Sequence, residues 1–229
     1  MYTLHIANKN YSSWSLRPWL LMTELGIEFN EQLHFFNDGT NWSEFRKFAP
    51  NGRVPCLVSR IEGQAQTVWD SLAITEYLAE SHTGVWPCSQ QARTWARCAS
   101  AEMHAGFGNV RNNCPMNVSV RIAMNDISGS FKAELDRIDE LWQEGICRFG
   151  GPFLAGANFS AVDAFFAPVV FRIRSYGLPV SQTSAQYIET VLNLPGMKGW
   201  IAAALKEPAE PSHEADCIRH GRLISDARH

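Results

Sequence analysis

Short extended runs alternate with helical runs over the first eighty residues. Thr3 to Ala7 places Leu4 and Ile6 on one face, which is the pattern of a half-buried strand. Three further extended runs cover Glu28 to Phe36, Cys56 to Ser59 and Gln66 to Trp69. Glu62-Gly63 is expected to form the turn between the last two. The pattern therefore predicts four strands.

Helical spacing separates these strands. Between the first and second strands, apolar residues fall on one helix face, namely Trp19, Leu20, Met22 and Leu25. Gly26 follows them and suits the C-terminal cap. Ser71 to Glu80 predicts a helix after the fourth strand. We expect three helices in residues 1–82, and the strand–helix–strand start implies a parallel pair with a right-handed crossover.

After His82 the apolar residues recur at spacings of three and four. Thr83 to Ser89 contains Gly84 and Pro87 and is interpreted as a linker. Helices are predicted beyond it over Gln91 to Asn112, Ile122 to Phe149, Ala161 to Tyr176, Ala185 to Leu192 and Gly196 to Leu205. The third is almost wholly apolar, which predicts the buried centre of this half. No strand is expected here, and the polar tail from Glu207 is expected to be irregular.

The two patterns predict two domains, an α/β domain over residues 1–82 and an all-helical domain over residues 89–229. Hydrophobic residues make up 45% of the chain, which is enough for a sizeable core. The net charge of -3 argues against nucleic acid as a partner. Met1 to Asn10 lacks the pattern of a signal peptide, and no apolar run reaches the about 18 residues of a membrane helix. We therefore expect a cytoplasmic protein that does not bind a membrane.

The cysteines do not form a metal-binding or disulfide pattern. There are six: Cys56, Cys88, Cys98, Cys114, Cys147 and Cys217. Their sequence spacings include neither a CxxC pair nor the arrangement of a zinc site with histidine. In a reducing cytoplasm they are expected to be free thiols, and no metal is expected.

Asp70-Ser71 stands at the expected start of a helix, directly after the fourth strand. A helix N-terminus presents free N–H groups and a partial positive charge, which suit a carboxylate. The Ser71 hydroxyl adds a donor, and the Asp70 carboxylate attracts an ammonium group. The pair therefore suits an amino-acid head group, and helix capping alone is the alternative.

Two other segments flank extended runs. Val54-Pro55 enters the third strand, and a cis bond there would turn the Val54 backbone groups outward, toward an extended peptide. An ordinary trans proline is the alternative. Ser12 to Ser15 follow the first strand at the start of the first helix. A hydroxyl there could donate a hydrogen bond to a thiolate and lower the pKa of the thiol, with helix capping again as the alternative.

Together these segments resemble the glutathione-site segments of cytosolic glutathione transferases, in particular serine-type, zeta/theta-like bacterial members. The resembling runs are Ser12 to Arg17, Phe48 to Pro55 and Trp69 to Leu78. Gly156 to Ala164 resembles the family's capping box on the central helix of the second domain. The resemblance covers residues 1–206. It implies a thioredoxin-like first domain, an all-helical second domain, glutathione as co-substrate without a metal, and a homodimer.

The resemblance also implies how the central part of glutathione is held. Ser12 takes the place of the serine that activates the thiol, and Ser13 is its rival because one residue of error in the loop would exchange them. Val54 supplies the backbone pair to the cysteinyl part, with Pro55 cis.

The two ends of glutathione have their own implied partners. Asp70 and Ser71 hold the γ-glutamyl head. Arg53 stands where several classes have a glutamine or lysine, and its planar fork of donors suits the glycine carboxylate.

The second substrate, a small hydrophobic electrophile, is expected beside the helix that begins near Gln91. His104 and Phe107 are candidates from that helix, and a structural histidine is the alternative for His104. Trp14 and Trp42 are candidates for the walls of the site, with core packing as the alternative for Trp42.

The implied activity is conjugation of the glutathione thiolate to such electrophiles. A glutathione-dependent isomerase of the maleylacetoacetate type is one alternative, disfavoured because zeta-class members usually carry cysteine where this chain has Trp14. A non-catalytic binding or scaffold protein with the same fold is the other. Omega and beta classes use cysteine at the position of Ser12, so reductase chemistry is disfavoured.

Overall fold

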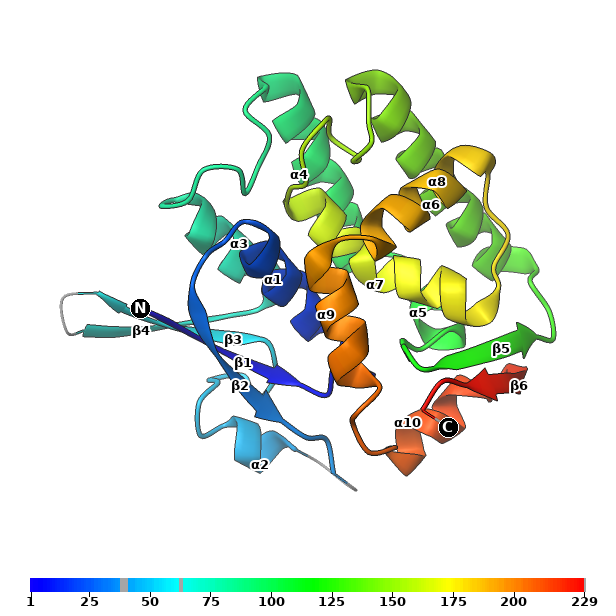
Figure 1. The fold of residues 1–229 in the computed structure, drawn as a ribbon, viewed down its shortest axis with the longest axis horizontal. Coiled ribbons are helices and arrows are strands. Elements are labelled where there is room, and N and C mark those ends of the chain that lie inside the picture. The colour runs from blue at the N-terminus through cyan, green and yellow to red at the C-terminus, as the bar shows by residue number, and fades with distance from the viewer. Residues whose placement is uncertain (38–40, 62–63, 229) are drawn as a thin grey trace.

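A four-stranded mixed sheet forms one side of the molecule (Figure 1). The computed structural model describes residues 1–37, 41–61 and 64–228, so the turn expected at Glu62-Gly63 lies outside the described residues. The strands are β1 (Tyr2–Ala7), β2 (Phe29–His34), β3 (Cys56–Ile61) and β4 (Gln64–Trp69), in the order β2-β1-β3-β4. β1 runs parallel to β2 and antiparallel to β3, and β3 runs antiparallel to β4. The predicted four strands and parallel first pair are confirmed.

Three helices accompany the sheet, as predicted. They are α1 (Ser13–Glu24), α2 (Trp42–Phe45) and α3 (Ser71–Ala79). Leu16, Leu20 and Leu21 of α1 are fully buried, and α1 packs against α3 and against the helix Ala161–Tyr176 of the second half. Gly26 has a φ of 64°, the left-handed conformation expected after a helix end.

Seven helices follow among the described residues. They are α4 (Gln90–Ala105), α5 (Gly108–Asn113), α6 (Gly129–Phe149), α7 (Ala161–Tyr176), α8 (Gln182–Leu192), α9 (Pro195–Ala204) and α10 (Pro211–Cys217). The side chains of α7 are almost all buried, and α1, α4 and α8 pack around it. The predicted buried central helix is confirmed. Not one helix of the described residues is long and apolar enough to cross a membrane.

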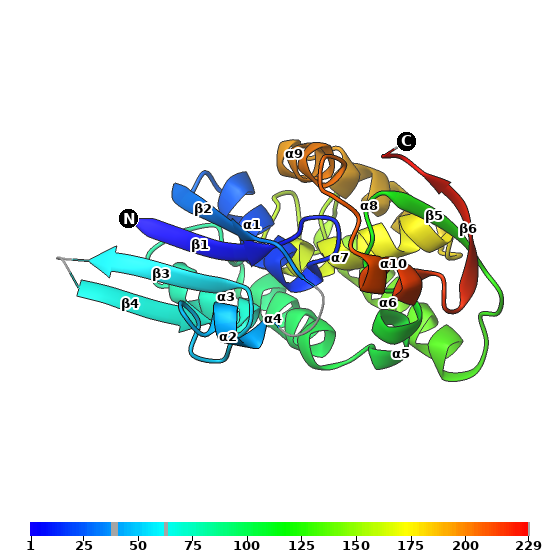
Figure 2. The ribbon, with the colours of Figure 1, turned by 90° about the horizontal axis from the view of Figure 1, so that it is seen from below.

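The second half is helical, but two strands also occur in it. β5 (Val120–Met124) and β6 (Gly221–Asp226) form a separate antiparallel pair (Figure 2). The expectation of helices alone is therefore corrected, and the helix expected from Ile122 begins only at Gly129. Val120 and Ile122 are buried whereas Arg121 and Ala123 are less so, which is the period-two pattern of a strand.

The helix expected over Gln91 to Asn112 is divided in two. The backbone leaves α4 at Gly106, and Phe107 takes a left-handed φ of 57° before α5 begins. The spacing of apolar side chains continues across this break, because both helices bury residues in the same core. Periodicity alone therefore could not reveal it.

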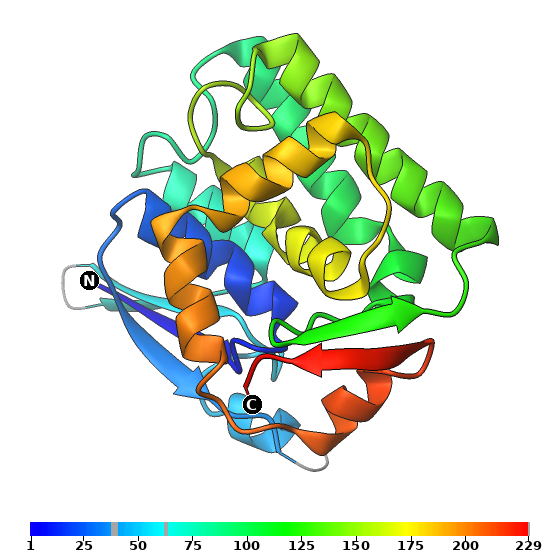
Figure 3. The same cartoon turned by 45° about the vertical axis from the view of Figure 1, so that its right-hand side comes forward.

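The polar tail is ordered rather than irregular. After α9 the chain crosses toward the first strand, forms α10 and ends in β6 beside β5 (Figure 3). Glu207 accepts hydrogen bonds from the backbone N–H groups of Lys9 and Asn10, at 2.8 and 2.9 Å. The end of the chain is thus attached to the loop that follows β1.

Candidate functional site

A cavity of about 570 Å³ opens between the first-half loops and the tail. It collects six residues that the sequence proposed for the site: Ser12, Ser13, Trp14, Trp42, Arg53 and Val54. The loop between β1 and α1, together with the first turn of α1, forms one wall, and the loop before β3 forms another. Phe36 and Trp42 come from the segment between β2 and β3, and His213 comes from α10.

The two candidate hydroxyls differ in their hydrogen bonds. Ser12 is 6% exposed, and its hydroxyl donates to Ser15 Oγ at 2.7 Å. Ser15 Oγ in turn accepts from the backbone N–H of Ala7. Ser13 Oγ instead accepts a hydrogen bond from Arg172 at 3.3 Å. A hydroxyl that accepts from a guanidinium keeps its own proton for another partner, so Ser13 is the better-placed donor.

The loop before β3 has the expected form. The Val54–Pro55 bond is cis. Gly52 has a φ of 62°, and a Cβ there would lie 2.6 Å from Trp42 Cδ1. Glycine is therefore required for the indole of Trp42 to lie against this loop. The Arg53 side chain is exposed at the cavity.

Asp70 and Ser71 begin α3 and do not line this cavity. The Asp70 carboxylate accepts from the N–H of Leu72 at 2.8 Å, so the capping role is present. Asp70 has a φ of 77°, a left-handed conformation that is rare for a residue with a side chain. Its side chain is 42% exposed, which leaves it accessible to a ligand. Ser71 is buried, and its Oγ accepts from Arg17 at 3.4 Å.

Buried arginines lie behind the loop that carries the serines. Arg17 is 3% exposed, and its guanidinium carbon lies 4.3 Å from the centre of the Trp14 ring. Burial, helped by the charges of Arg111 and Arg172, lowers the pKa of Arg17 to about 9, against the attraction of Asp70. Burial lowers the pKa of Arg172 to about 10. At neutral pH both remain charged, so the loop has a positive environment beneath it.

His104 and Phe107 lie outside the cavity wall. His104 Nε2 is 3.5 Å from the Asp70 carboxylate, and its ring meets that of Trp14 edge-on at 5.2 Å. Burial lowers the pKa of His104, although the charge of Asp70 opposes this. Phe107 is 6% exposed and packs in the hydrophobic core. His104 therefore connects Trp14 to Asp70, and Phe107 is a core residue.

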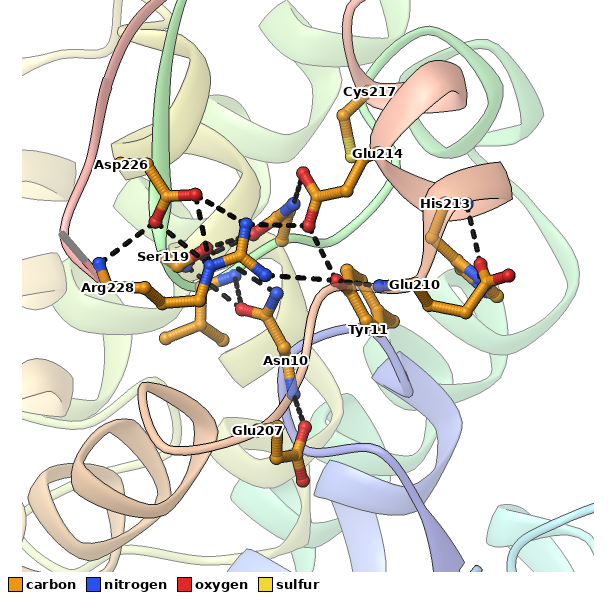
Figure 4. Close-up of polar contacts among 12 residues, drawn as sticks. Asn10, Tyr11, Ser119, Glu207, Glu210, His213, Glu214, Cys217, Asp226 and Arg228 are labelled. Atoms are coloured by element: carbon orange, nitrogen blue, oxygen red, sulfur yellow. Dashed lines mark hydrogen bonds and ion pairs between the residues drawn. The ribbon is translucent and has the colours of Figure 1, made fainter. Parts of the chain in front are cut away.

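Sequence reasoning missed several residues around this site, of which Arg172, Tyr11 and His213 are the most informative. Arg172 is an arginine inside an almost wholly apolar helical run, and that contrast was a usable signal. Tyr11 precedes the serines, but its hydroxyl donates to Glu214 at 2.5 Å (Figure 4). Burial and this carboxylate raise the pKa of Tyr11, so it is a structural phenol. His213 lies in a tail whose local pattern gave no signal.

Comparisons with known proteins address the family of the chain. Residues 11–81 match the model "Glutathione S-transferase, N-terminal domain", and residues 123–203 match "Glutathione S-transferase, C-terminal domain". The glutathione S-transferase-like protein OpS6 of Beauveria bassiana is 23% identical over 203 residues, covering 84% of this chain and 87% of that protein. The class-mu 26 kDa isozyme 1 of Fasciola hepatica is 23% identical over 224 residues, covering 88% and 96%.

Solved structures give the same fold. A glutathione transferase homolog from Burkholderia GL BGR1, solved with bound glutathione, superimposes with a TM-score of 0.66 at 18% identity. The match covers 90% of this chain and 99% of that one.

Proposed function

Because the chain belongs to the glutathione S-transferase family, we propose that it joins the thiolate of glutathione to small hydrophobic electrophiles. The observation that carries this proposal is the single cavity that brings Ser13, Arg53 and Val54 together. A hydroxyl donor, a cationic fork and the backbone of the residue before the cis proline match the thiol, the terminal carboxylate and the peptide of glutathione.

In this proposal glutathione lies extended along the first-half loops. Its cysteinyl part pairs with the Val54 backbone, and its glycine carboxylate meets Arg53. Its γ-glutamyl head lies at Asp70 and Ser71, where the carboxylate of Asp70 is open to an ammonium group. Glutathione is the co-substrate, and no metal takes part.

The thiol is activated by a serine hydroxyl at the start of α1. A free thiol has a pKa of about 8.5, and a donated hydrogen bond lowers it by stabilising the thiolate. Ser13 fits this role better than Ser12, because Arg172 leaves its proton free. The charges of Arg17 and Arg172 favour the thiolate further. The thiolate then attacks an electrophile held against the aromatic walls of the cavity.

A purified sample mixed with glutathione and chlorodinitrobenzene tests the proposal. We expect formation of the thioether, and binding of glutathione by calorimetry. Binding of glutathione without turnover of any electrophile would favour a binding or scaffold role. Turnover of a maleyl β-diketone in place of electrophiles would favour the isomerase, although Trp14 stands where zeta-class members usually have cysteine.

We further expect a homodimer in the cytoplasm, as the resemblance to cytosolic transferases implies. An exposed apolar groove along β4 and α3, with Trp69 43% exposed, is consistent with a contact there. Light scattering at micromolar concentration should give twice the chain mass of 25.7 kDa, and a species of the single-chain mass alone would contradict it.

A further inference from the structure

The outer wall of the cavity comes from a segment beyond both family-model matches. The second of these matches ends at residue 203, whereas His213 belongs to α10. Its imidazole stacks with two aromatic rings, and the ring centroids lie 4.8 Å from that of Tyr11 and 4.9 Å from that of Phe36. The interplanar angles of 28° and 19° make both stacks nearly parallel. The ring of His213 therefore has a fixed plane at the cavity.

Glu210 fixes the rotation of this ring within its plane. Its carboxylate lies 2.5 Å from His213 Nδ1 and also accepts from the hydroxyl of Ser212 at 2.7 Å. Burial acts to raise the pKa of Glu210, but the hydrogen bonds from Ser212 and His213 lower it to about 2. The carboxylate is thus ionised, and Nδ1 carries a proton toward it. Nε2 has no protein partner within the described part of the chain, so it is the ring nitrogen left for a ligand.

The tail that carries this pair is tied to the loop of the serines (Figure 4). The Tyr11 hydroxyl donates to Glu214 and accepts from the backbone N–H of Glu210 at 3.0 Å. Arg228 pairs with Glu214 at 2.8 Å and also donates to the Tyr11 hydroxyl. Because Tyr11 immediately precedes Ser12 and Ser13, the position of the imidazole is fixed relative to the proposed thiolate.

We propose that His213 is a catalytic proton donor for conjugated carbonyl electrophiles, held in place by Glu210 as a positioning residue. This inference rests on the proposed function of the cavity. The cavity is lined by aromatic side chains, among them Phe36 and Trp42, and such a lining suits flat conjugated enones. The imidazole at one wall supplies what these electrophiles need and haloarenes do not, a proton for the oxygen that becomes negative.

The thiol gives its proton to solvent, and the thiolate sulfur forms a bond to the β-carbon of the enone. The electron pair of the carbon–carbon double bond moves toward the carbonyl, giving an enolate. The doubly protonated imidazole gives the proton on Nε2 to this enolate, while Nδ1 stays bonded to Glu210, and then regains a proton from solvent. In a haloarene substitution, halide leaves and no proton has to be delivered.

The test compares two electrophiles on the same enzyme. For each variant kcat is measured with phenylbutenone and with chlorodinitrobenzene at saturating glutathione. His213→Gln should lower the ratio of the enone rate to the haloarene rate by about 100-fold, the lower range for general acid catalysis. Glu210→Gln should lower the same ratio by a smaller factor, in kcat rather than in KM. His220→Gln changes an exposed histidine of the same tail and should keep the wild-type ratio.

His213→Phe separates chemistry from packing, because it keeps the stack with Tyr11 and Phe36 but has no ring nitrogen. We expect this variant to lower the ratio of the enone rate to the haloarene rate as much as His213→Gln does. Its melting temperature should stay close to that of the wild type. A ratio within threefold of the wild type in either variant, or a wild type that does not turn over phenylbutenone, would overturn the inference. Absence of turnover with both electrophiles, together with absence of glutathione binding, would instead refute the proposed function.

Discussion

At the scale of single residues, the hydrogen bonds around the serines decide which hydroxyl can serve a ligand. The sequence motif favoured Ser12, because it aligns with the activating serine of related classes. The structure places the Ser12 hydroxyl against Ser15, and the Ser13 oxygen against a buried arginine. A motif records residue types and spacing, but the direction of a hydroxyl depends on Arg172, which lies 159 residues away. The roles of both serines remain predictions.

Replacing Ser13 with alanine should raise the pKa of bound glutathione by about one to two pKa units, which corresponds to ~1.4–2.7 kcal/mol. Turnover near neutral pH should fall about tenfold or more and partly recover at higher pH, since less thiolate is present at pH 7. Glutathione affinity should stay nearly intact, because Arg53, Val54 and Asp70 hold the rest of the peptide. Titration of thiolate absorbance against pH measures the shift.

Ser12→Ala is the matched comparison, one position away at the N-cap of α1. It should leave the thiol pKa nearly unchanged, because the Ser12 hydroxyl is engaged by Ser15. A raised thiol pKa in the Ser12 variant, with an unchanged one in the Ser13 variant, would return the activating role to Ser12.

At the scale of elements, the local pattern of apolar residues predicted those helices and strands whose formation depends on residues close in sequence. The strands β1 to β4, the helix α1 and the central helix α7 follow from periodicity over ten to twenty residues. β5 and β6 do not, because Val120 pairs with Asp226 across more than one hundred residues. Likewise His213 reaches the cavity only because the tail folds back, which local pattern cannot encode.

The buried carboxyl group at the start of α7 predicts how the stability of the fold depends on pH. Asp163 is fully buried and accepts from the backbone N–H groups of Leu154 and Ser160, both at 3.0 Å. Burial raises the pKa of Asp163 to about 6, although these hydrogen bonds oppose it. Between pH 4 and 6 the folded state therefore holds a proton that the unfolded state has lost. The free energy of unfolding consequently falls as the pH rises through this window, by up to ~3 kcal/mol.

Denaturant unfolding of the wild type and Asp163→Asn at several pH values should detect this. The free energy of unfolding of the wild type, minus that of the variant, should fall from pH 4 to 6 and level off above. Asp136→Asn changes an aspartate whose side chain is 60% exposed, and should change stability by less than about 1 kcal/mol throughout. A difference for Asp163→Asn that is constant with pH would contradict the shift.

At the scale of the whole molecule, the two ends of the chain are held together by polar contacts. Arg228 lies 8% exposed and contacts Glu214, Asp226 and Tyr11. Its bonds to these groups raise the pKa of its guanidinium. Glu207 meanwhile holds the backbone of Lys9 and Asn10. These contacts hold the tail from Glu207 onward against the loop that follows β1.

Replacing Arg228 with methionine should lower the free energy of unfolding by about 3 kcal/mol, because it leaves two carboxylates without their buried partner. It should also loosen α10 and so reduce turnover. Arg219→Met removes a tail arginine whose side chain is 62% exposed, and should cost less than about 1 kcal/mol. Denaturant unfolding of both variants measures the two losses in free energy of unfolding. Equal losses would contradict the prediction that Arg228 contributes more to stability than Arg219.

The strand pairing of β6 with β5 also bears on how the protein is made. Translation adds about 5–20 residues per second, so residues 1–203 are synthesised before β6. The early helices can form in the meantime. β6 follows α10 in sequence, so the pairing of Asp226 with Val120 cannot form until residue 226 has been synthesised. During synthesis the first-half walls of the cavity, with Ser13 and Val54, therefore emerge before the wall that carries His213.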